Sequence, residues 1–368
     1  MTTAGNQDVK RYNTIKLVVS LVETVVSLTL LVILLAGGYT VYFEQYATTF
    51  SNNPYIALLI FAALIGGIDA IITFPLSWYS GFILEHHYHL SNQTFAQWLW
   101  EKTKSILVSI PIAMPLLLLF YYFLQTFGSQ WWLPVGIILF IVSVGLSRIA
   151  PIVILPLFYN LTPLDDSPLK NKILAMIKTT SMHVEGIYSF NLSKTTKKAN
   201  AAFTGIGKSK RILLSDTLLK NFTDEEIETV FAHELGHYVH SHLWKSIAFG
   251  TISIFIGLYC TSLAYTASLS WFGFSSITQI AALPLLALWL GLYSLVTLPI
   301  GNMISRAHEY DADQYALQRT KNTAAFVSTM NKLAAMNLAD KQPHPLIEFL
   351  FYSHPSIEKR IAAAERAQ

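Results

Sequence analysis

The sequence has few charged residues and a single cysteine, and both shortages restrict what the protein can be. Asp, Glu, Lys and Arg make up 13% of the 368 residues, about half of the ~25% found in ordinary soluble domains. Such a chain has too little polar surface to coat a water-soluble globule. Cys260, standing alone, excludes a disulfide framework and a zinc site built on several cysteines.

Apolar residues are abundant instead, at 53% of the chain, with a mean hydropathy of +0.44. Six stretches are apolar and long enough for the roughly 20 helical residues that cross a bilayer. We therefore predict a mainly α, multi-pass protein embedded in a lipid bilayer. The spans are expected near 17–42, 55–80, 105–126, 132–157, 244–268 and 280–304.

The Lys and Arg residues alternate between the two ends of these spans. The connections 43–54, 127–131 and 269–279 have none, whereas the N-terminus and 81–104 have several and 158–243 is rich in them. Basic connections stay on the cytosolic side of a membrane. We expect both termini and the 158–243 segment in the cytosol, at a prokaryotic cytoplasmic membrane or a eukaryotic endoplasmic reticulum, and no nucleic-acid partner.

Three ionisable residues, Glu23, Asp69 and Arg148, lie inside predicted spans. Charges at such positions usually face a partner or a water-filled cavity. One interpretation is an Asp69–Arg148 or Glu23–Arg148 pair that fixes helix packing. The other is a wet intramembrane chamber or a transport pathway.

The parts outside the membrane mix helix and strand patterns. A helix is predicted from Ser167-Pro168 to about Met182, strands at 186–192, 200–204 and 211–214, and a hairpin turn at 205–209. Two later helices are predicted at 323–338 and 355–367. The chain divides into 1–160 with four spans, 161–243 with a small α+β part, 244–304 with two spans, and a helical 305–368.

The 81–104 connection predicts a helix that leads into the third span. Ser91 is its expected N-cap, and Phe95, Trp98 and Leu99 form its apolar stripe. Three histidines nearby lack a partner motif, so we interpret them as part of a solvated turn and not as ligands. They are His86, His87 and His89.

Residues 233–237 read His-Glu-Leu-Gly-His, a pattern expected by chance roughly 0.01 times in a chain of this composition. Thr223 and Glu226 form a capping box upstream, which predicts a helix through the motif. His233 and His237 then lie one turn apart on one face and can share a metal. Glu234 lies beside them, suited to taking a proton from water.

A hydrolytic zinc site needs a third protein ligand, and the candidates follow the sixth span. Glu309 and Asp313 share one face of a helix, so Glu309 can ligate while Asp313 accepts a hydrogen bond from a ligand imidazole. His308 is a rival ligand, and Asp311 points elsewhere. The alternative interpretation of Asp313 is that it forms an ion pair with Arg306 or Arg319 and does not orient a ligand.

Together these motifs make the sequence similar to a known family. His-Glu-Leu-Gly-His, two apolar spans, Glu-Tyr-Asp-Ala-Asp and then Ser-His-Pro-Ser-Ile-Glu-Lys-Arg resemble the type I CAAX prenyl endopeptidases, which are integral-membrane zinc proteases. The resemblance covers roughly residues 60–365 and includes Phe82-Ile-Leu-Glu85. The chain departs from the family at the substrate strand, where Ser-Asn-Ala-Tyr is replaced by Ala-Asn-Ala-Ala, and in having six spans where eukaryotic members have seven.

The resemblance implies a fold in which helices enclose a membrane chamber, with a zincin-like catalytic part on its cytosolic side. It implies one Zn²⁺ held by His233, His237 and Glu309, with Glu234 as general base and Asp313 orienting a ligand. His354 would steady the oxyanion, unless it is only a helix-end residue. Asn200 and Ala201 would lie on the strand that holds the substrate.

The sequence thus predicts a zinc endopeptidase that cuts a peptide or protein, with or without a C-terminal prenyl group. A membrane quality-control protease with little sequence preference is the alternative within proteases. A transporter or scaffold with a structural metal is the alternative outside them. The presence of Glu234 argues against a purely structural metal, which needs no base.

Overall fold

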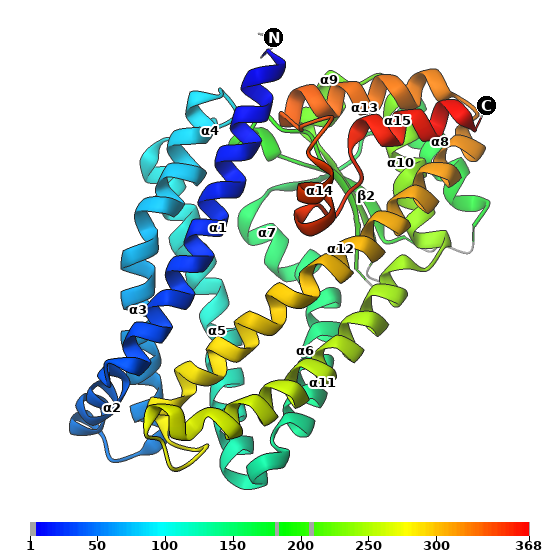
Figure 1. Cartoon of the computed structure of the whole chain (residues 1–368). Helices are drawn as coiled ribbons and strands as arrows, with labels where there is room; N and C mark the ends of the chain where they lie inside the picture. The colour runs from blue at the N-terminus through cyan, green and yellow to red at the C-terminus, as the bar shows by residue number, and fades with distance from the viewer. Residues whose placement is uncertain (1–4, 181–183, 206–209, 368) are drawn as a thin grey trace.

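The computed structural model describes residues 5–180, 184–205 and 210–367. Within them, six helical segments are long and apolar enough to cross a membrane, which confirms the predicted mainly α, multi-pass class (Figure 1). These segments are Asn6–Ala36, Pro54–His87, Phe95–Gln130, Trp132–Phe158, His242–Phe272 and Ile280–Thr320.

The first span ends earlier than the sequence predicts. Helix α1 (Asn6–Ala36) stops at a glycine pair, and Gly38 has a φ of 69°, a conformation that side chains disfavour. A second helix, α2 (Tyr39–Phe50), occupies most of the predicted 43–54 loop. The prediction was wrong because apolar residues continue on both sides of the glycines, so hydropathy does not register the break.

The next spans contain local irregularities. Helix α3 (Pro54–Trp78) continues through a π-turn, Tyr79–Ile83, into α4 (Leu84–His87). In the same way α6 (Trp132–Ile149) continues through Ala150–Ile154 into α7 (Leu155–Phe158).

Helix α5 (Phe95–Phe127) begins at a different cap from the one predicted. Thr94 is the N-cap, because its side chain and that of Gln97 form a reciprocal capping box. Ser91 instead forms a β-bridge with Thr196. Upstream, both ring nitrogens of His86 contact backbone carbonyls, those of Phe82 and Gln93, which is a structural role.

The expected charge pairs within the membrane are not formed. Among the described residues, no ion pair joins Glu23, Asp69 and Arg148, and Arg148 lies exposed in the last turn of α6, where the helix dipole favours a cation. The membrane helices surround an apolar cavity of about 470 Å³, lined by α1, α3, α5, α6, α11 (His242–Ser268) and α12 (Leu283–Thr320).

A four-stranded sheet lies at one end of the membrane helices, in the order β1-β2-β4-β3. Strands β2 and β4 are parallel, and β3 pairs antiparallel with β4 and forms the sheet edge. The predicted turn at 206–209 lies outside the described residues. So does Met182, the expected end of α8, whose described part ends at Lys178. The strands are β1 (Leu161–Pro163), β2 (Gly186–Phe190), β3 (Ala201–Thr204) and β4 (Arg211–Ser215).

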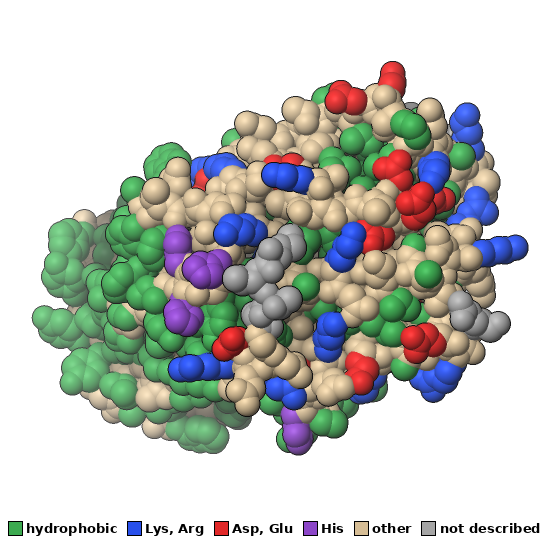
Figure 2. All heavy atoms as spheres, turned by 90° about the horizontal axis from the view of Figure 1, so that it is seen from above, with side chains coloured by type: hydrophobic (Ala, Val, Ile, Leu, Met, Phe, Trp, Pro, Cys, Tyr) green, Lys and Arg blue, Asp and Glu red, His purple; other side chains and the backbone are tan. Residues whose placement is uncertain are grey.

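Helices pack around this sheet and return into the membrane. The longest, α12, has 38 residues and runs without a break across the predicted boundary at residue 304. Charged side chains of both signs spread over the face that carries the sheet and the C-terminal helices (Figure 2). The helices are α8 (Pro168–Lys178), α9 (Asp216–Asn221), α10 (Asp224–Val239), α11 (His242–Ser268), α12 (Leu283–Thr320), α13 (Thr323–Asn337), α14 (Pro345–Phe351) and α15 (Ile357–Arg366).

Candidate metal centre

Helix α10 carries the His-Glu-Leu-Gly-His motif on a well-anchored scaffold. The predicted capping box is present, since Thr223 and Glu226 satisfy each other's backbone N–H groups. One stripe of the helix, including Ile227, Phe231 and Leu235, is fully buried in the core under the sheet. Burial of this stripe fixes the rotation of α10 and turns His233 and His237 towards α12.

Gly236 lets α10 and α12 approach closely. A Cβ at this position would lie 2.9 Å from the Cα of Ala312, closer than real Cβ contacts. Ala312 is adjacent to Asp313 and one turn from Glu309 on α12. The glycine within the motif therefore brings the third candidate ligand to the two histidines.

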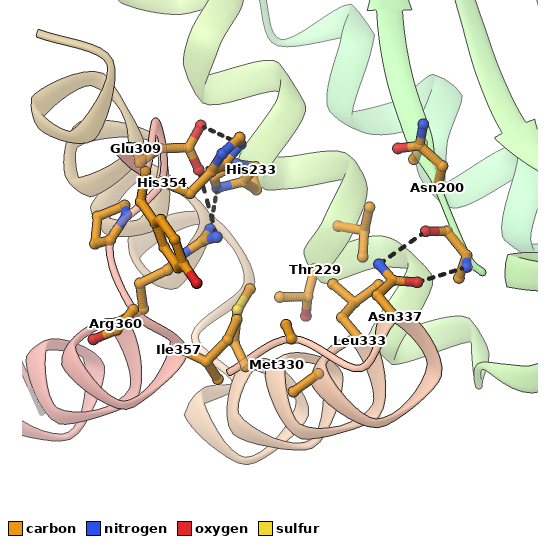
Figure 3. Close-up of a pocket in the computed structure, with 18 of the residues that line it drawn as sticks. Asn200, Thr229, His233, Glu309, Met330, Leu333, Asn337, His354, Ile357 and Arg360 are labelled. Atoms are coloured by element: carbon orange, nitrogen blue, oxygen red, sulfur yellow. Dashed lines mark hydrogen bonds and ion pairs between the residues drawn. The ribbon is translucent and has the colours of Figure 1, made fainter. Parts of the chain in front are cut away.

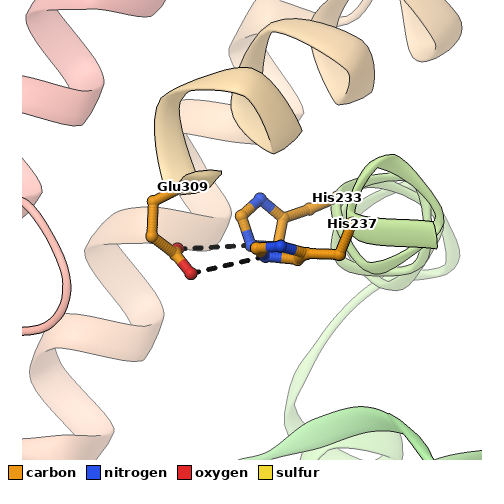
Figure 4. A group of neighbouring side chains, drawn as sticks. All are labelled: His233, His237 and Glu309. Atoms are coloured by element: carbon orange, nitrogen blue, oxygen red, sulfur yellow. Dashed lines mark hydrogen bonds and ion pairs between the residues drawn. The ribbon is translucent and has the colours of Figure 1, made fainter. Parts of the chain in front are cut away.

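The structure brings His233, His237 and Glu309 into one cluster (Figure 4). The two Nε2 atoms lie 3.2 Å apart. Glu309 oxygens lie 3.4 Å from His233 Nε2 and 3.3 Å from His237 Nε2. Tetrahedral zinc with bonds of roughly 2.0–2.1 Å separates its ligand atoms by about 3.3 Å. The donor set and its spacing therefore fit a zinc ion, and Glu309 Oε2 is buried without a hydrogen bond.

Asp313 and Arg360 support the first histidine from behind. Asp313 Oδ1 lies 2.9 Å from His233 Nδ1, as the helical spacing predicted. Arg360 holds the same carboxylate through two hydrogen bonds of 2.8 and 2.6 Å. It also lies 3.4 Å from Glu309, and both residues are labelled in Figure 3. Arg306 and Arg319, the alternative partners of Asp313, instead contact backbone carbonyls of α14 and the hydroxyl of Thr179.

The sequence alone assigns no role to Arg360, although this residue ends the Ser-His-Pro-Ser-Ile-Glu-Lys-Arg motif. Its position within a motif that the chain shares with the family was the signal that could have identified it as a site residue. Burial disfavours the charged form of His233, but the neighbouring carboxylates of Asp313 and Glu309 outweigh this and raise its pKa to about 9.

Glu234 lies beside the metal-ligand cluster, half-buried, and lines the same pocket as the cluster. Burial raises the pKa of its carboxyl, and the charged forms of His233 and His237 and the backbone N–H of Phe203 only partly oppose this. A carboxylate with a raised pKa is a stronger base. Its position and environment suit proton transfer.

The metal-ligand cluster opens into a pocket of about 400 Å³, and the start of edge strand β3 lies along this pocket. The backbone of Asn200 pairs with Ser215 at the end of β4. Because backbone groups alternate in direction along a strand, those of Ala201 and Phe203 face the free edge. The side chain of Asn337 on α13 fixes the backbone just before β3 through two hydrogen bonds with Ala199 (Figure 3).

His354 lies at the mouth of the pocket, just before α15. Its side chain is 63% exposed, and its Nε2 lies 3.4 Å from Glu309 Oε1. The rival ligand His308 is not in the cluster, because it stacks on His242 at 4.1 Å. Asp311 also points away from the cluster, 3.5 Å from His242 Nε2.

Comparison with known proteins agrees with this site and fold. A model of peptidase family M48 matches residues 163–368. A model of the CAAX prenyl protease N-terminal region, described as five membrane helices, matches residues 1–160. An uncharacterized metalloprotease of Bacillus subtilis, YhfN, is 32% identical over 91% of this chain and 80% of its own length.

Two further relatives come from yeasts. CAAX prenyl protease 1 of Saccharomyces cerevisiae is 29% identical, over 83% of this chain and 72% of its own length. The crystal structure of S. mikatae Ste24p matches with a TM-score of 0.88 and 26% identity, covering 98% of this chain and 89% of that one.

The fold and the site define a multi-pass membrane metallopeptidase. The chain belongs to peptidase family M48, and its architecture is that of the CAAX prenyl proteases, which confirms the resemblance seen in the sequence.

Proposed function

We propose that the protein is a zinc endopeptidase that cuts peptides next to a prenylated cysteine near their C-terminus. The observation that carries this proposal is the spacing of His233, His237 and Glu309, at 3.2–3.4 Å between ligand atoms, with Glu234 beside them. Zinc held by these three side chains would supply Lewis acidity towards water and the scissile carbonyl.

The chain's own groups perform the proton transfers. Glu234 takes a proton from the attacking water and delivers it to the leaving amine. Asp313 keeps His233 in the tautomer that presents Nε2 to the metal. His354, exposed at the pocket mouth, donates to the oxyanion that forms on the scissile carbonyl.

The substrate lies extended along the free edge of β3. The outward-facing backbone groups of Ala201 and Phe203 pair with it, as in other cases of strand addition. The backbone of Asn200 pairs with Ser215, and its side chain lines the pocket, where it contacts the bound peptide. An Asn200→Ala variant should lower the catalytic efficiency on a good substrate; unchanged efficiency would argue against this docking.

The decisive experiment uses purified protein, two matched peptides and a Glu234→Gln variant. One peptide carries a farnesylated C-terminal CAAX cysteine and the other is bare. We expect cleavage of the farnesylated peptide, a loss of 10²–10⁴-fold in rate for the variant, and one zinc per chain in both proteins. Equal cleavage of both peptides would indicate a broad membrane endopeptidase, and cleavage of neither by the zinc-loaded enzyme would exclude this substrate class.

A further inference from the structure

The two candidate histidine ligands are supported by different partners. His233 uses Nδ1 to contact the carboxylate of Asp313, as described above. His237 has no carboxylate behind it. Its Nδ1 instead lies 2.9 Å from Nδ1 of His242, which is the first residue of α11 and is only 3% exposed. The function proposed above assigns no role to His242.

The chain reverses sharply to bring these two rings together. Helix α10 ends at Val239, and Ser241 then adopts a φ of 56°, in the left-handed region that residues other than glycine rarely occupy. Two turn hydrogen bonds, from the N–H groups of His240 and Ser241 back to α10, stabilise the reversal. A strained backbone at this point places His242 directly over His237.

The position of the protons follows from the contacts of His237. Its Nε2 faces Glu309 and His233, so a metal there requires Nε2 without a proton. The single proton of the neutral ring is then on Nδ1 and is donated to Nδ1 of His242. His242 in turn carries its proton on Nε2, which faces Asp311 at 3.5 Å.

The remaining contacts of His242 hold its ring in place. It stacks on His308 with the ring planes within 10° of parallel, and His240 packs nearby at 5.6 Å. Such a stacked, buried ring has little freedom to rotate away from His237. Its Nε2 makes no hydrogen bond to the described residues, so its fixed orientation comes from packing and from the contact with His237.

We propose that His242 is a positioning residue that holds His237 in the metal-binding tautomer and orientation, as Asp313 does for His233. This proposal rests on the proposed function in one respect, namely that His237 binds the metal through Nε2. The choice of a neutral acceptor has a physical reason. Asp313 is balanced by Arg360, which is buried with it, whereas the cation that acts on His242, Lys245, is exposed and would compensate a second buried carboxylate less well.

The test compares metal binding by full-length protein in detergent for His242→Leu and His242→Asn. Leucine removes the acceptor, whereas the amide oxygen of asparagine can replace Nδ1. Zinc affinity is measured by competition with a chromophoric chelator, and the cobalt-substituted proteins give a visible spectrum that reports ligand geometry. His87→Leu, at an exposed histidine of α4 that lies outside the metal-ligand cluster and its pocket, is the matched control.

We expect His242→Leu to weaken zinc binding by 10–100-fold, the usual effect of removing a group that orients a ligand, and to change the cobalt spectrum. His242→Asn should recover most of both properties. In a His242→Gly variant, added imidazole should restore affinity, which also covers the case in which the leucine variant folds poorly.

Wild-type affinity and an unchanged cobalt spectrum in folded His242→Leu would overturn the proposal. So would equal losses in the leucine and asparagine variants without rescue by imidazole. A different result would contradict the proposed function and leave the role of His242 standing. In that result, the wild-type protein and the Glu234→Gln variant both bind zinc, but neither cleaves either peptide.

Discussion

Arg360 is a charged residue buried among the groups that form the metal centre. It pairs with Asp313 and lies close to Glu309, so it compensates two carboxylates that are themselves buried. Removing one member of a buried ion pair usually costs more than the pair contributes, because the remaining charge loses its partner. Arg360 therefore contributes most to the stability of the protein when no metal ion is bound at the centre.

We predict that Arg360→Met destabilises the metal-free protein by about 3–5 kcal/mol. Zinc should recover part of this loss, since its charge also neutralises Glu309. The measurement is thermal unfolding in detergent with and without zinc, and Arg360→Lys serves as the variant that keeps the charge. An equal loss of stability in both metal states would contradict this account.

The residues of the centre differ in how visible they are from the sequence. His233, His237 and Glu234 follow from a five-residue motif, and Asp313 follows from Glu309 by helical spacing. Arg360 reaches Asp313 across 47 residues, and no local period connects two positions so far apart. His242 follows His237 by five residues, but only the reversal at Ser241 turns its ring back towards the motif.

At the scale of elements, the packing of α10 against α12 determines the geometry of the centre. Gly236 is the point of closest approach, as its missing Cβ shows. Gly236→Ala should force the helices apart at a cost of about 1–3 kcal/mol and weaken zinc binding by moving Glu309. Zinc content after dialysis measures this, with Gly250→Ala on α11, where a Cβ meets open space, as control. Full zinc retention in Gly236→Ala would contradict the argument.

The start of α10 is attached to α13 through Glu226. Its carboxylate accepts hydrogen bonds of 2.6 Å from both Ser328 and Lys332, in addition to capping its own helix. Burial raises the pKa of this carboxyl, but these hydrogen bonds outweigh burial and the pKa is lowered. A lowered pKa in the folded state means that the carboxylate stabilises the fold above its ordinary pKa, and that this is lost as pH falls through the folded value.

We therefore predict that Glu226→Gln lowers stability by about 1.5–3 kcal/mol at pH 7. The difference in stability between the variant and the wild type should become smaller below about pH 4, where the ordinary glutamate pKa lies. Melting temperatures of both proteins across this range measure the effect. A gap that stays constant with pH would show that charge on Glu226 is not responsible.

Side-chain caps were identified correctly at α8 and α10 but misplaced at α5, and the end of α1, which the backbone determines, was missed. The capping box at Thr223 set the start of α10 as expected. The end of α1 was misplaced because a glycine in the left-handed conformation, and not a change in hydropathy, ends that helix. The pairing of β3 with β4 was foreseen from two short strand patterns around a turn.

For the whole molecule, the alternation of basic connections with connections that lack Lys and Arg predicts a single orientation in the membrane. After Cys260 is replaced by alanine, single cysteines at Asn52 and Glu365 should react from opposite sides. In intact cells, an impermeant maleimide should label Asn52→Cys at once and Glu365→Cys only after permeabilisation. Labelling of both in intact cells would exclude this orientation.

The unbroken helix α12 joins the metal centre directly to the last predicted span. Glu309 follows Ile304, the predicted end of the last span, by five residues, or about 8 Å of helical rise. A peptide bond must therefore approach within about one and a half helical turns of the lipid to be cut. A substrate tethered to the same leaflet is already at that height and finds the centre by a search in two dimensions, whereas a freely dissolved protein must search in three.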